Sequence, residues 1–397
     1  MRNMALKNLC FMKSGGTPSR KNPSFYEGEI PWAKISDLEF SPDGYIYDTK
    51  EHITQEALAS INNRFFDAGT LFLAMYGSVG KTGISKIPMT TNQAILGINI
   101  KEKDLLDINY LKYWFKTIKQ SLLDRAVGAA LPNISLTIVK DLKIPLPPLE
   151  QQKKIAAILD AADTYRQKTK ALITKYDELT QSLFLDMFGD PVRNPKGWEV
   201  NFLKQITTKI GSGATPRGGK QAYKKEGISL IRSMNVYDNR FKYKNLAFID
   251  EDQAAKLKNV IVEKGDVLFN ITGASICRSS VVPDDVLPAR VNQHVSILRP
   301  IKSIITSKFL SRFLISENVK TKLLGVGSGG GAVMEAITKE QLQSIEVIKP
   351  PLELQNEFSK RVQSIEVQKA QAQASLAQAE DLFNSLLQRA FKGELVS

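Results

Sequence analysis

Residues 352–392, LELQNEFSKRVQSIEVQKAQAQASLAQAEDLFNSLLQRAFK, contain neither glycine nor proline. Their apolar residues recur in steps of four and three, the spacing of a helix that packs along one stripe. The stripe consists of Phe358, Val362, Ile365, Ala372, Leu376, Ala379, Phe383, Leu386 and Ala390, with Lys369 as a polar interruption. The pattern predicts one long helix with a coiled-coil seam, roughly 50 to 60 Å long at 1.5 Å per residue.

A second stretch of this kind lies near the middle of the chain, at residues 155–188. Its stepping residues are Ile158, Ala162, Tyr165, Thr169, Leu172, Tyr176, Leu179 and Leu183. It stops at Gly189-Asp190-Pro191, which is typical of a helix C-terminus. One heptad helix alone would most simply indicate self-association of chains. Two in one chain can pair with each other, so we predict an antiparallel intramolecular coiled coil.

Both helices follow the same phrase, which belongs to a longer repeat. Pro147-Pro148-Leu149-Glu150 with Gln152 recurs as Pro350-Pro351-Leu352-Glu353 with Gln355. Five earlier phrases recur in the same order: KSGGTP at 13–18 as GSGATP at 211–216, 30–38 as 228–236, Gly69-Thr70-Leu71 as Gly265-Asp266-Val267, Gly77-Ser78 as Gly273-Ala274, and Asn92-Gln93 as Asn292-Gln293. This constant order predicts two copies of one domain, each followed by a long helix.

Within each copy, short runs rich in Val, Ile, Phe and Tyr alternate with Gly, Asn, Asp and Pro turns, which favours strands. Residues 30–38 and 228–236 are expected strands, and 108–123 and 307–324 are expected helices. We therefore predict an α+β fold with domains at 1–149 and 189–350. The spacer helices occupy 150–188 and 351–397, and the two halves are related by an approximate two-fold axis.

The net charge of +13 is distributed unevenly along the chain. It is +3 for residues 1–150, +1 for 151–188, +10 for 189–350 and −1 for 351–397. The two domains thus carry the positive charge, and the second carries most of it. A field of this sign attracts a polyanion, whereas the nearly neutral helices are better suited to protein contacts.

Several classes of site are disfavoured by the residues present. Cys10 and Cys277 are far apart and only His52 and His294 supply imidazoles, so structural zinc, disulfides and His-dependent triads are not expected. Residues 77–82, GSVGKT, resemble a phosphate loop but have Met75 where its first glycine belongs. No apolar run reaches the roughly 18 residues of a membrane helix. We expect a cytoplasmic protein without a membrane partner.

Two further partial motifs also lack what their chemistry needs. Asp43, Asp48 and Lys50 mimic a nuclease metal set but are close enough in sequence to form one polar hairpin turn. Residues 145–149, PLPPL, lack the polar and aromatic residues of an adenine methyltransferase motif. Neither a Gly-rich dinucleotide fingerprint nor a complete catalytic set is apparent.

Taken together, these phrases resemble the specificity (S) subunit of type I DNA restriction-modification systems, the HsdS family. The resemblance rests on S-G-x-T-P opening each copy, IPWAKISDL at 30–38, P-P-L-E-x-Q before each long helix, MFGDPVRNPKGW at 187–198 and AFKGEL at 390–395. It covers residues 9–395. It implies that each domain is a target recognition domain reading one half of a split double-stranded DNA sequence, with the helices setting the spacing.

The resemblance also implies the partners. Two modification (methyltransferase) subunits would dock on the helices and restriction/translocase subunits would join them. S-adenosylmethionine, ATP and Mg would then be bound by those partners, and this chain would bind no cofactor and catalyse nothing by itself.

DNA contacts are expected from polar and basic residues on Gly-rich loops, where side chains reach base edges and phosphates. In the first domain the candidates are Lys13, Ser14, Thr17, Arg20, Lys34, Tyr76, Ser78 and Lys81. In the second they are Ser212, Thr215, Arg217, Lys220, Arg232, Asn235, Asn270, Thr272, Arg278 and Arg290. For each residue a solvated loop or structural turn is the alternative. Gly15, Gly16 and Gly213 are interpreted as backbone requirements rather than contacts.

Two other functions remain open on the sequence alone. A different nucleic-acid-binding protein or adaptor would self-associate through residues 352–392. An autonomous nuclease or methyltransferase would have to act without a complete nuclease metal set or methyltransferase motif.

Overall fold

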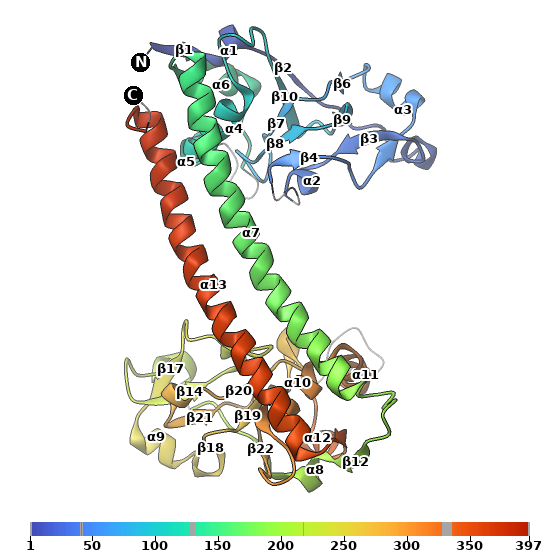
Figure 1. The fold of residues 1–397 in the computed structure, drawn as a ribbon, viewed down its shortest axis with the longest axis vertical. Coiled ribbons are helices and arrows are strands. Elements are labelled where there is room, and N and C mark those ends of the chain that lie inside the picture. Colours follow the sequence, from blue (N-terminus) through green and yellow to red (C-terminus); the bar gives the residue numbers. More distant parts are fainter. Residues whose placement is uncertain are drawn as a thin grey trace. The chain divides into compact units, whose positions relative to one another are not determined.

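The computed structural model describes residues 2–39, 41, 43–126, 132–216, 218–327 and 336–395. The chain divides into two compact units, unit 1 with residues 1–173 and 371–397 and unit 2 with residues 174–370. There are two long helices, α7 (Leu149–Phe188) and α13 (Leu352–Lys392). Each contributes one segment to unit 1 and another segment to unit 2. Each unit therefore combines a globular α+β part with segments of both helices (Figure 1).

Unit 1 is built on two mixed sheets and one antiparallel strand pair. The first sheet has the order β2 (Cys10–Ser14), β10 (Ile95–Ile100), β7 (Leu71–Ala74), β8 (Thr82–Ser85), β4 (Tyr45–Ile46). The second has the order β5 (His52–Ile53), β3 (Ile30–Ala33), β9 (Met89–Thr91), β6 (Phe65–Phe66), and the pair is β1 (Arg2–Ala5) with β11 (Lys143–Leu146). Its shorter helices are α1 (Leu6–Leu9), α2 (Ile35–Glu39), α3 (Gln55–Ser60), α4 (Ile108–Thr117), α5 (Lys119–Asp124), α6 (Leu136–Asp141) and the 3₁₀ turn η1 (Pro23–Tyr26).

Unit 2 repeats these sheets, except that its first sheet has four strands where that of unit 1 has five. Its first sheet has the order β13 (Thr207–Ser212), β22 (Val295–Pro300), β19 (Val267–Asn270), β20 (Ser279–Val281). Its second has the order β17 (Ala247–Ile249), β14 (Ile228–Ile231), β21 (Ala289–Val291), β18 (Ile261–Val262), and its strand pair is β12 (Glu199–Phe202) with β23 (Glu346–Lys349). The pairing of β3 with β9 is parallel, and so is the corresponding pairing of β14 with β21. The predicted duplication of an α+β domain is therefore confirmed.

The helices of unit 2 follow the same succession. They are α8 (Leu203–Ile206), α9 (Glu251–Ala255), α10 (Ser307–Ile315), α11 (Glu317–Gly327) and α12 (Lys339–Gln343). The 3₁₀ turns are η2 (Gly219–Ala222), η3 (Ser233–Asn235), η4 (Lys258–Val260), η5 (Gly273–Ser275) and η6 (Asp284–Val286). A short hairpin, β15 (Val236–Tyr237) with β16 (Arg240–Phe241), stands where unit 1 has β4.

The strands predicted at 30–38 and 228–236 are only half right. Each strand stops after four residues, at Ala33 and Ile231, and a helical turn follows. The side chain of Asp37 accepts a hydrogen bond from Lys34 N at 2.7 Å, and Asn235 accepts one from Arg232 N at 3.1 Å. These side chains compete with the sheet for backbone donors, which ends both strands.

The helices predicted at 108–123 and 307–324 are each broken in two. Unit 1 forms α4 and α5 with the break at Ile118, and unit 2 forms α10 and α11 with the break at Ser316. Apolar periodicity continues across both breaks, so it cannot reveal them.

The long helices are part of each hydrophobic core. In unit 2 the rings of Phe184 and Phe188 from α7 pack with Phe309 of α10 and Phe358 of α13, with centroids 4.7 to 5.7 Å apart. In unit 1 Tyr110 and Tyr113 of α4 lie against Phe391 and Phe383 of α13. Burying such side chains contributes about 2 to 3 kcal/mol each, so the domains and helices fold together.

Helices α7 and α13 run antiparallel within each unit (Figure 1). In unit 1 Lys170 forms an ion pair with Glu380 at 2.9 Å, and in unit 2 Asp177 forms one with Lys369 at 2.5 Å. The predicted seam of α13 is confirmed, since Phe358, Val362, Ala372, Ala379, Phe383 and Ala390 are all buried. This seam is covered by α7 in both units, so self-association through residues 352–392 loses its main support.

The predicted seam of α7 is right at alternate positions and wrong at the others. Thr169 is buried, but Ile158, Tyr165, Leu172 and Leu179 are 38, 55, 43 and 50% exposed. The buried stripe instead includes Ile155, Leu159, Thr180, Phe184 and Met187. Helix α7 carries two adjoining apolar stripes, and spacing alone cannot tell which one meets α13.

Candidate nucleic-acid interface

Three loops leave one edge of the first sheet in unit 1. Ser14 at the end of β2 pairs with Leu96, and Ala74 at the end of β7 pairs with Ile95 at the start of β10. Because β10 runs antiparallel to both neighbours, residues 15–20, 75–81 and 92–94 emerge side by side. In unit 2 the pairings Ser212 with Ser296 and Asn270 with Val295 bring 213–216, 271–278 and 292–294 together. We call each of these groups the loop edge of its unit.

The S-G-x-T-P phrase needs its glycine for close backbone packing. A Cβ atom on Gly15 would lie 2.1 Å from the carbonyl oxygen of Thr91, and one on Gly213 would lie 1.7 Å from that of Val291. Backbone hydrogen bonds, Gly15 N to Ile95 O and Gly213 N to Asn292 O, both 3.1 Å, hold the strands together here. The interpretation of both glycines as backbone requirements is confirmed.

The threonine of the same phrase orients a glutamine. The hydroxyl of Thr17 donates to Oε1 of Gln93, and that of Thr215 donates to Oε1 of Gln293 at 2.5 Å. Both glutamines are exposed. An amide oxygen has two lone pairs, so Oε1 of each glutamine can accept a second hydrogen bond while Nε2 donates. Neither glutamine was among the predicted contacts, although the recurrence of Asn-Gln in both copies was a usable signal.

Two predicted cations of unit 1 share one carboxylate. Arg20 binds Glu51 at 2.6 Å, and Lys34 also donates to Glu51. Partial burial raises the pKa of Glu51, but the hydrogen bonds from Lys34 and Arg20 outweigh it and leave the pKa below its usual value. The guanidinium of Arg20 also lies 3.9 Å from the ring centre of Tyr26. The cluster is therefore ordered and keeps a net positive charge.

The other candidates of unit 1 lie at or beside the same edge. Lys13 is exposed, with Nζ 5.4 Å from the ring centre of Phe66, and Ser14 is half-buried at the end of β2. Tyr76 is exposed, Ser78 donates to Glu39 at 2.5 Å, and Lys81 is half-buried where the loop enters β8. This loop joins two antiparallel strands, β7 and β8, whereas a phosphate loop joins a strand to a helix.

In unit 2 a different set of side chains lies at or beside the loop edge. Arg232 donates to the carbonyl of Asn245 and lies 5.2 Å from the ring centre of Tyr223. Thr272 Oγ1 is 2.6 Å from His294 Nδ1. The guanidinium of Arg278 lies 4.5 Å from the ring centre of Tyr237, and Ser212 is half-buried at the end of β13.

Three predicted residues of unit 2 are used inside the fold. Asn235 and Asn270 are fully buried, and their amides donate to Lys242 O at 2.8 Å and Ser233 O at 2.9 Å. Arg290 binds the carbonyl oxygens of Ala254 and Ala289, and burial lowers the pKa of its guanidinium. Arg217 and the side chain of Lys220 lie outside the described residues.

The described residues contain no group of three or more His, Cys, Asp or Glu that could hold a metal ion. Asp43 and Asp48, which resemble part of a nuclease set, bind Tyr47 and His52 in the turn that carries them. None of the described helices combines the length and hydropathy needed to cross a bilayer.

Comparison with known proteins identifies the domain that is duplicated. The type I restriction modification DNA specificity domain matches twice, at residues 1–179 and 195–378. The MjaIX specificity subunit of Methanocaldococcus jannaschii is 26% identical, over 98% of this chain and 92% of that protein. The EcoBI specificity subunit of Escherichia coli is 25% identical, over 82% of this chain and 74% of that protein.

Solved structures share the fold over nearly the whole length. The type I S subunit of M. genitalium gives a TM-score of 0.60 at 15% identity, covering 98% of this chain and 96% of the other. A second structure, from work on assembly and conformational transition of the type I system, gives a TM-score of 0.60 at 20% identity and covers 99% and 98%. The chain therefore belongs to the type I restriction-modification DNA specificity family and is a specificity subunit that recognises a DNA sequence.

Proposed function

We propose that this subunit reads a bipartite double-stranded DNA target, with one half-site at the loop edge of each unit. The observation that carries the proposal is the repeated Thr–Gln pair, Thr17 with Gln93 and Thr215 with Gln293, at equivalent edges of equivalent sheets. The residues around the two pairs differ, with Arg20, Lys34 and Glu51 in one unit and Arg232, Thr272 and His294 in the other. Different surroundings favour two different half-site sequences.

The chemistry of the edge suits base recognition. A glutamine amide can pair with the N6 and N7 edge of adenine in the major groove, and an amide already oriented by a threonine loses less side-chain entropy on binding. The neighbouring cations would hold phosphates and fix the register of the duplex without reading sequence. Each edge thus combines a reader with positioning charges.

The long helices are proposed as spacer and docking surface. In unit 1 the exposed side chains Ile158, Tyr165 and Leu172 follow each other at seven-residue spacing on α7. Such an apolar stripe on a helix that is otherwise charged suits contact with another protein. Two modification subunits would dock here and on the equivalent face in the other half of the chain, together with restriction/translocase subunits.

In this assembly the present chain contributes recognition only. S-adenosylmethionine, ATP and Mg would be held by the partners, and methyl transfer and DNA cleavage would occur there. The proposal would fail if purified chain alone transferred methyl groups to DNA.

Sequence selection from random duplexes is the direct test, using the full chain bound to its modification subunits. We expect Gln93→Ala to relax base preference in one half-site and Gln293→Ala to relax it in the other. Loss of one bidentate contact should reduce discrimination by roughly 5- to 150-fold, which corresponds to about 1 to 3 kcal/mol. Gln378→Ala, at an exposed position of α13, is the matched control. Selection of one undivided motif would contradict the bipartite target.

A further inference from the structure

Unit 2 contains a cleft of about 1060 Å³. Its walls come from α7, the β15–β16 hairpin, helices α10 and α11, Lys369 of α13, and Arg278 at the end of the loop 271–278. Arg240, Arg278 and Arg312 line it, together with Tyr237. Arg278 is the last residue of the loop 271–278, so this wall of the cleft adjoins the loop edge proposed to meet DNA.

Arg312 of α10 is an uncompensated charge on this cleft. Its Nε atom is covered by protein and has no hydrogen-bond partner, and within the described residues Arg312 forms no ion pair. Desolvation by burial lowers the pKa of its guanidinium to about 10, although the carboxylates of Asp177, Glu366 and Asp238 counteract this shift. Burying an unpaired guanidinium is unfavourable, so an anion in the cleft would be stabilised.

The carboxylates near Arg312 are already bound by lysines. Asp177 pairs with Lys369 at 2.5 Å, Glu366 with Lys308 at 2.6 Å, and Asp238 with Lys320. These three ion pairs carry no net charge, so the positive charge of Arg312 remains uncompensated. Glu178, Glu317 and Asp190 also line the cleft. Glu178 and Glu317 are exposed to water, which screens their charge, and Asp190 accepts hydrogen bonds from Asn318 and from the backbone N–H groups of Val192 and Arg193.

At the equivalent position in unit 1, the side chain has a hydrogen-bond partner. Tyr113 stands six residues after Asp107, the N-cap of α4, as Arg312 stands six residues after Thr306, the N-cap of α10. The hydroxyl of Tyr113 donates to Asp160 at 2.5 Å, and Lys112 binds the same carboxylate at 3.1 Å. Unit 1 therefore supplies its own acceptor at this place, whereas unit 2 presents a cation.

Two further guanidinium groups lie beside Tyr237. Arg278 is 4.5 Å and Arg240 is 5.2 Å from the centre of its ring. Hydrogen bonding and charge from Lys242, with a smaller effect of Arg278, lower the pKa of the Tyr237 hydroxyl. An aromatic ring with cations on it holds the guanidinium planes in place, which favours bidentate binding of a phosphate.

We propose that this cleft binds a phosphate of the DNA backbone flanking the half-site read by unit 2, with Arg312 as the inner contact and Arg278 and Arg240 beside it. The inference rests on the proposed function. A DNA phosphate is favoured over an acidic protein segment because the Arg278 wall belongs to the loop edge. The contact would position the duplex and would add affinity without sequence preference.

The test is the salt dependence of binding, measured by fluorescence anisotropy on the selected duplex with the complex of full chain and modification subunits. We expect Arg312→Gln to weaken binding roughly tenfold and to reduce the slope of log K against log salt by about 0.9, the value for one phosphate contact. Base preference should stay unchanged. Arg312→Lys should retain most of the slope, since it keeps the charge.

A phosphate-by-phosphate comparison locates the contact. Replacing single phosphates by neutral methylphosphonates should weaken wild-type binding at one position beside the unit 2 half-site, and Arg312→Gln should lose no further affinity there. Identical profiles for wild type and Arg312→Gln would overturn the proposal. Arg312→Gln removes an uncompensated buried charge, so it should not lower the melting temperature. The same methylphosphonate experiment on Arg278→Gln tests the cleft independently of α10.

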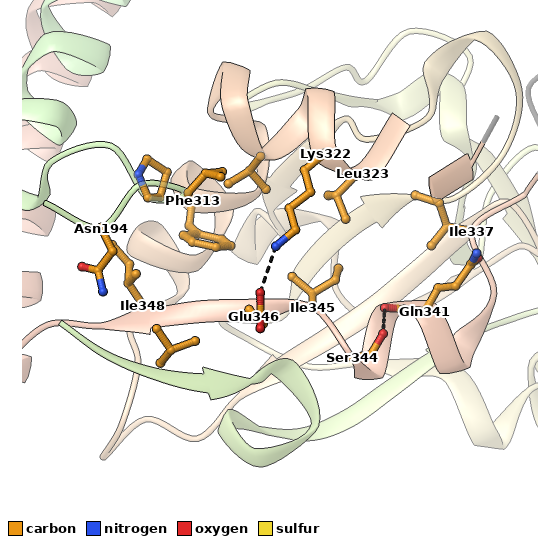
Figure 2. Close-up of a pocket in the computed structure, with 14 residues that line it drawn as sticks. Asn194, Phe313, Lys322, Leu323, Ile337, Gln341, Ser344, Ile345, Glu346 and Ile348 are labelled. Atoms are coloured by element: carbon orange, nitrogen blue, oxygen red, sulfur yellow. Dashed lines mark hydrogen bonds and ion pairs between the residues drawn. The ribbon is translucent and has the colours of Figure 1, made fainter. Parts of the chain in front are cut away.

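Lys322 supplies the matched control in the same unit. It lines a separate, largely apolar pocket of about 330 Å³, where it faces Glu346 at 2.9 Å (Figure 2). Its charge is already paired, so Lys322→Gln should leave the salt slope unchanged.

Two other outcomes are distinguishable. If Arg312→Gln keeps the DNA salt slope but weakens binding of a modification subunit, the anion is a protein carboxylate and the proposal is wrong. If selection yields no preferred sequence for the wild-type complex, the proposed function itself fails, whatever Arg312 does.

Discussion

Oε1 of Gln152, in the first turn of α7, accepts a hydrogen bond from the backbone N–H of Asp107 at 3.0 Å. Its Nε2 donates to the carbonyl oxygens of Leu105 and Pro147, both at 2.8 Å. Gln355 repeats the arrangement with Thr306 N at 2.8 Å, Ile304 O at 3.1 Å and Pro350 O at 2.9 Å. The glutamine of P-P-L-E-x-Q therefore joins each long helix to the start of α4 or α10.

Replacing this glutamine should destabilise the unit that contains it. Gln152 and Gln355 are both fully buried, so alanine would leave an N–H and two carbonyl groups without partners. We expect Gln152→Ala and Gln355→Ala each to lower the free energy of unfolding by about 3 kcal/mol. Denaturant titration followed by circular dichroism measures the loss. Gln378→Ala should change it by less than about 0.5 kcal/mol, and an equal loss there would contradict the assignment.

The stability of unit 2 should be equally sensitive to replacement of Gly213 at its loop edge. Gly213→Ala would push a methyl group into the Val291 carbonyl, so we expect about 3 kcal/mol of destabilisation and weaker DNA binding. Gly211→Ala is the matched control two residues earlier on β13, because a Cβ there has no heavy atom within 4 Å. Thermal melting of the two variants gives the comparison. Similar melting temperatures would show that the close approach is relieved at little cost.

Helix length should determine the spacing between the half-sites. Deleting 167–173 from α7 and 374–380 from α13 removes both partners of the Lys170–Glu380 pair and retains the Asp177–Lys369 pair. Seven residues correspond to about 10 Å of helix, or about 3 base pairs of DNA. Sequence selection should then return the same half-sites with about 3 fewer base pairs between them. An unchanged gap would rule out the spacer role, and either deletion alone should instead disturb the helix pairing.

The two thiols should be unreactive in the folded protein. Burial raises the pKa of Cys10 to about 12, partly offset by Lys101, and that of Cys277 to about 11, partly offset by Lys320. Both groups therefore stay protonated at pH 8, and the thiolate is the reactive form. A chromogenic disulfide reagent should label the native chain slowly and label two thiols quickly in denaturant. Rapid labelling of the native chain would show that a unit opens readily.

Local sequence patterns were sufficient to predict the elements that are encoded by residues close together in the chain. The duplicated phrases correctly predicted two α+β domains, because equivalent strands arise from equivalent local sequences. The four-three spacing of 352–392 predicted both α13 and its buried seam, since a helix turns its side chains at a fixed angle. Glycine in S-G-x-T-P was likewise a local signal of close backbone approach.

Only the tertiary structure decided which groups meet across long sequence separations. It placed Gln93 against Thr17 and Gln293 against Thr215, buried Asn235 and Asn270, and left one apolar stripe of α7 exposed. Among the described residues it also gave Arg312 no ion-pair partner, whereas it paired Tyr113 of unit 1 with Asp160. The sequence shows which face of a helix is apolar and which residues are charged. It does not show which other part of the fold covers that face or pairs with that charge.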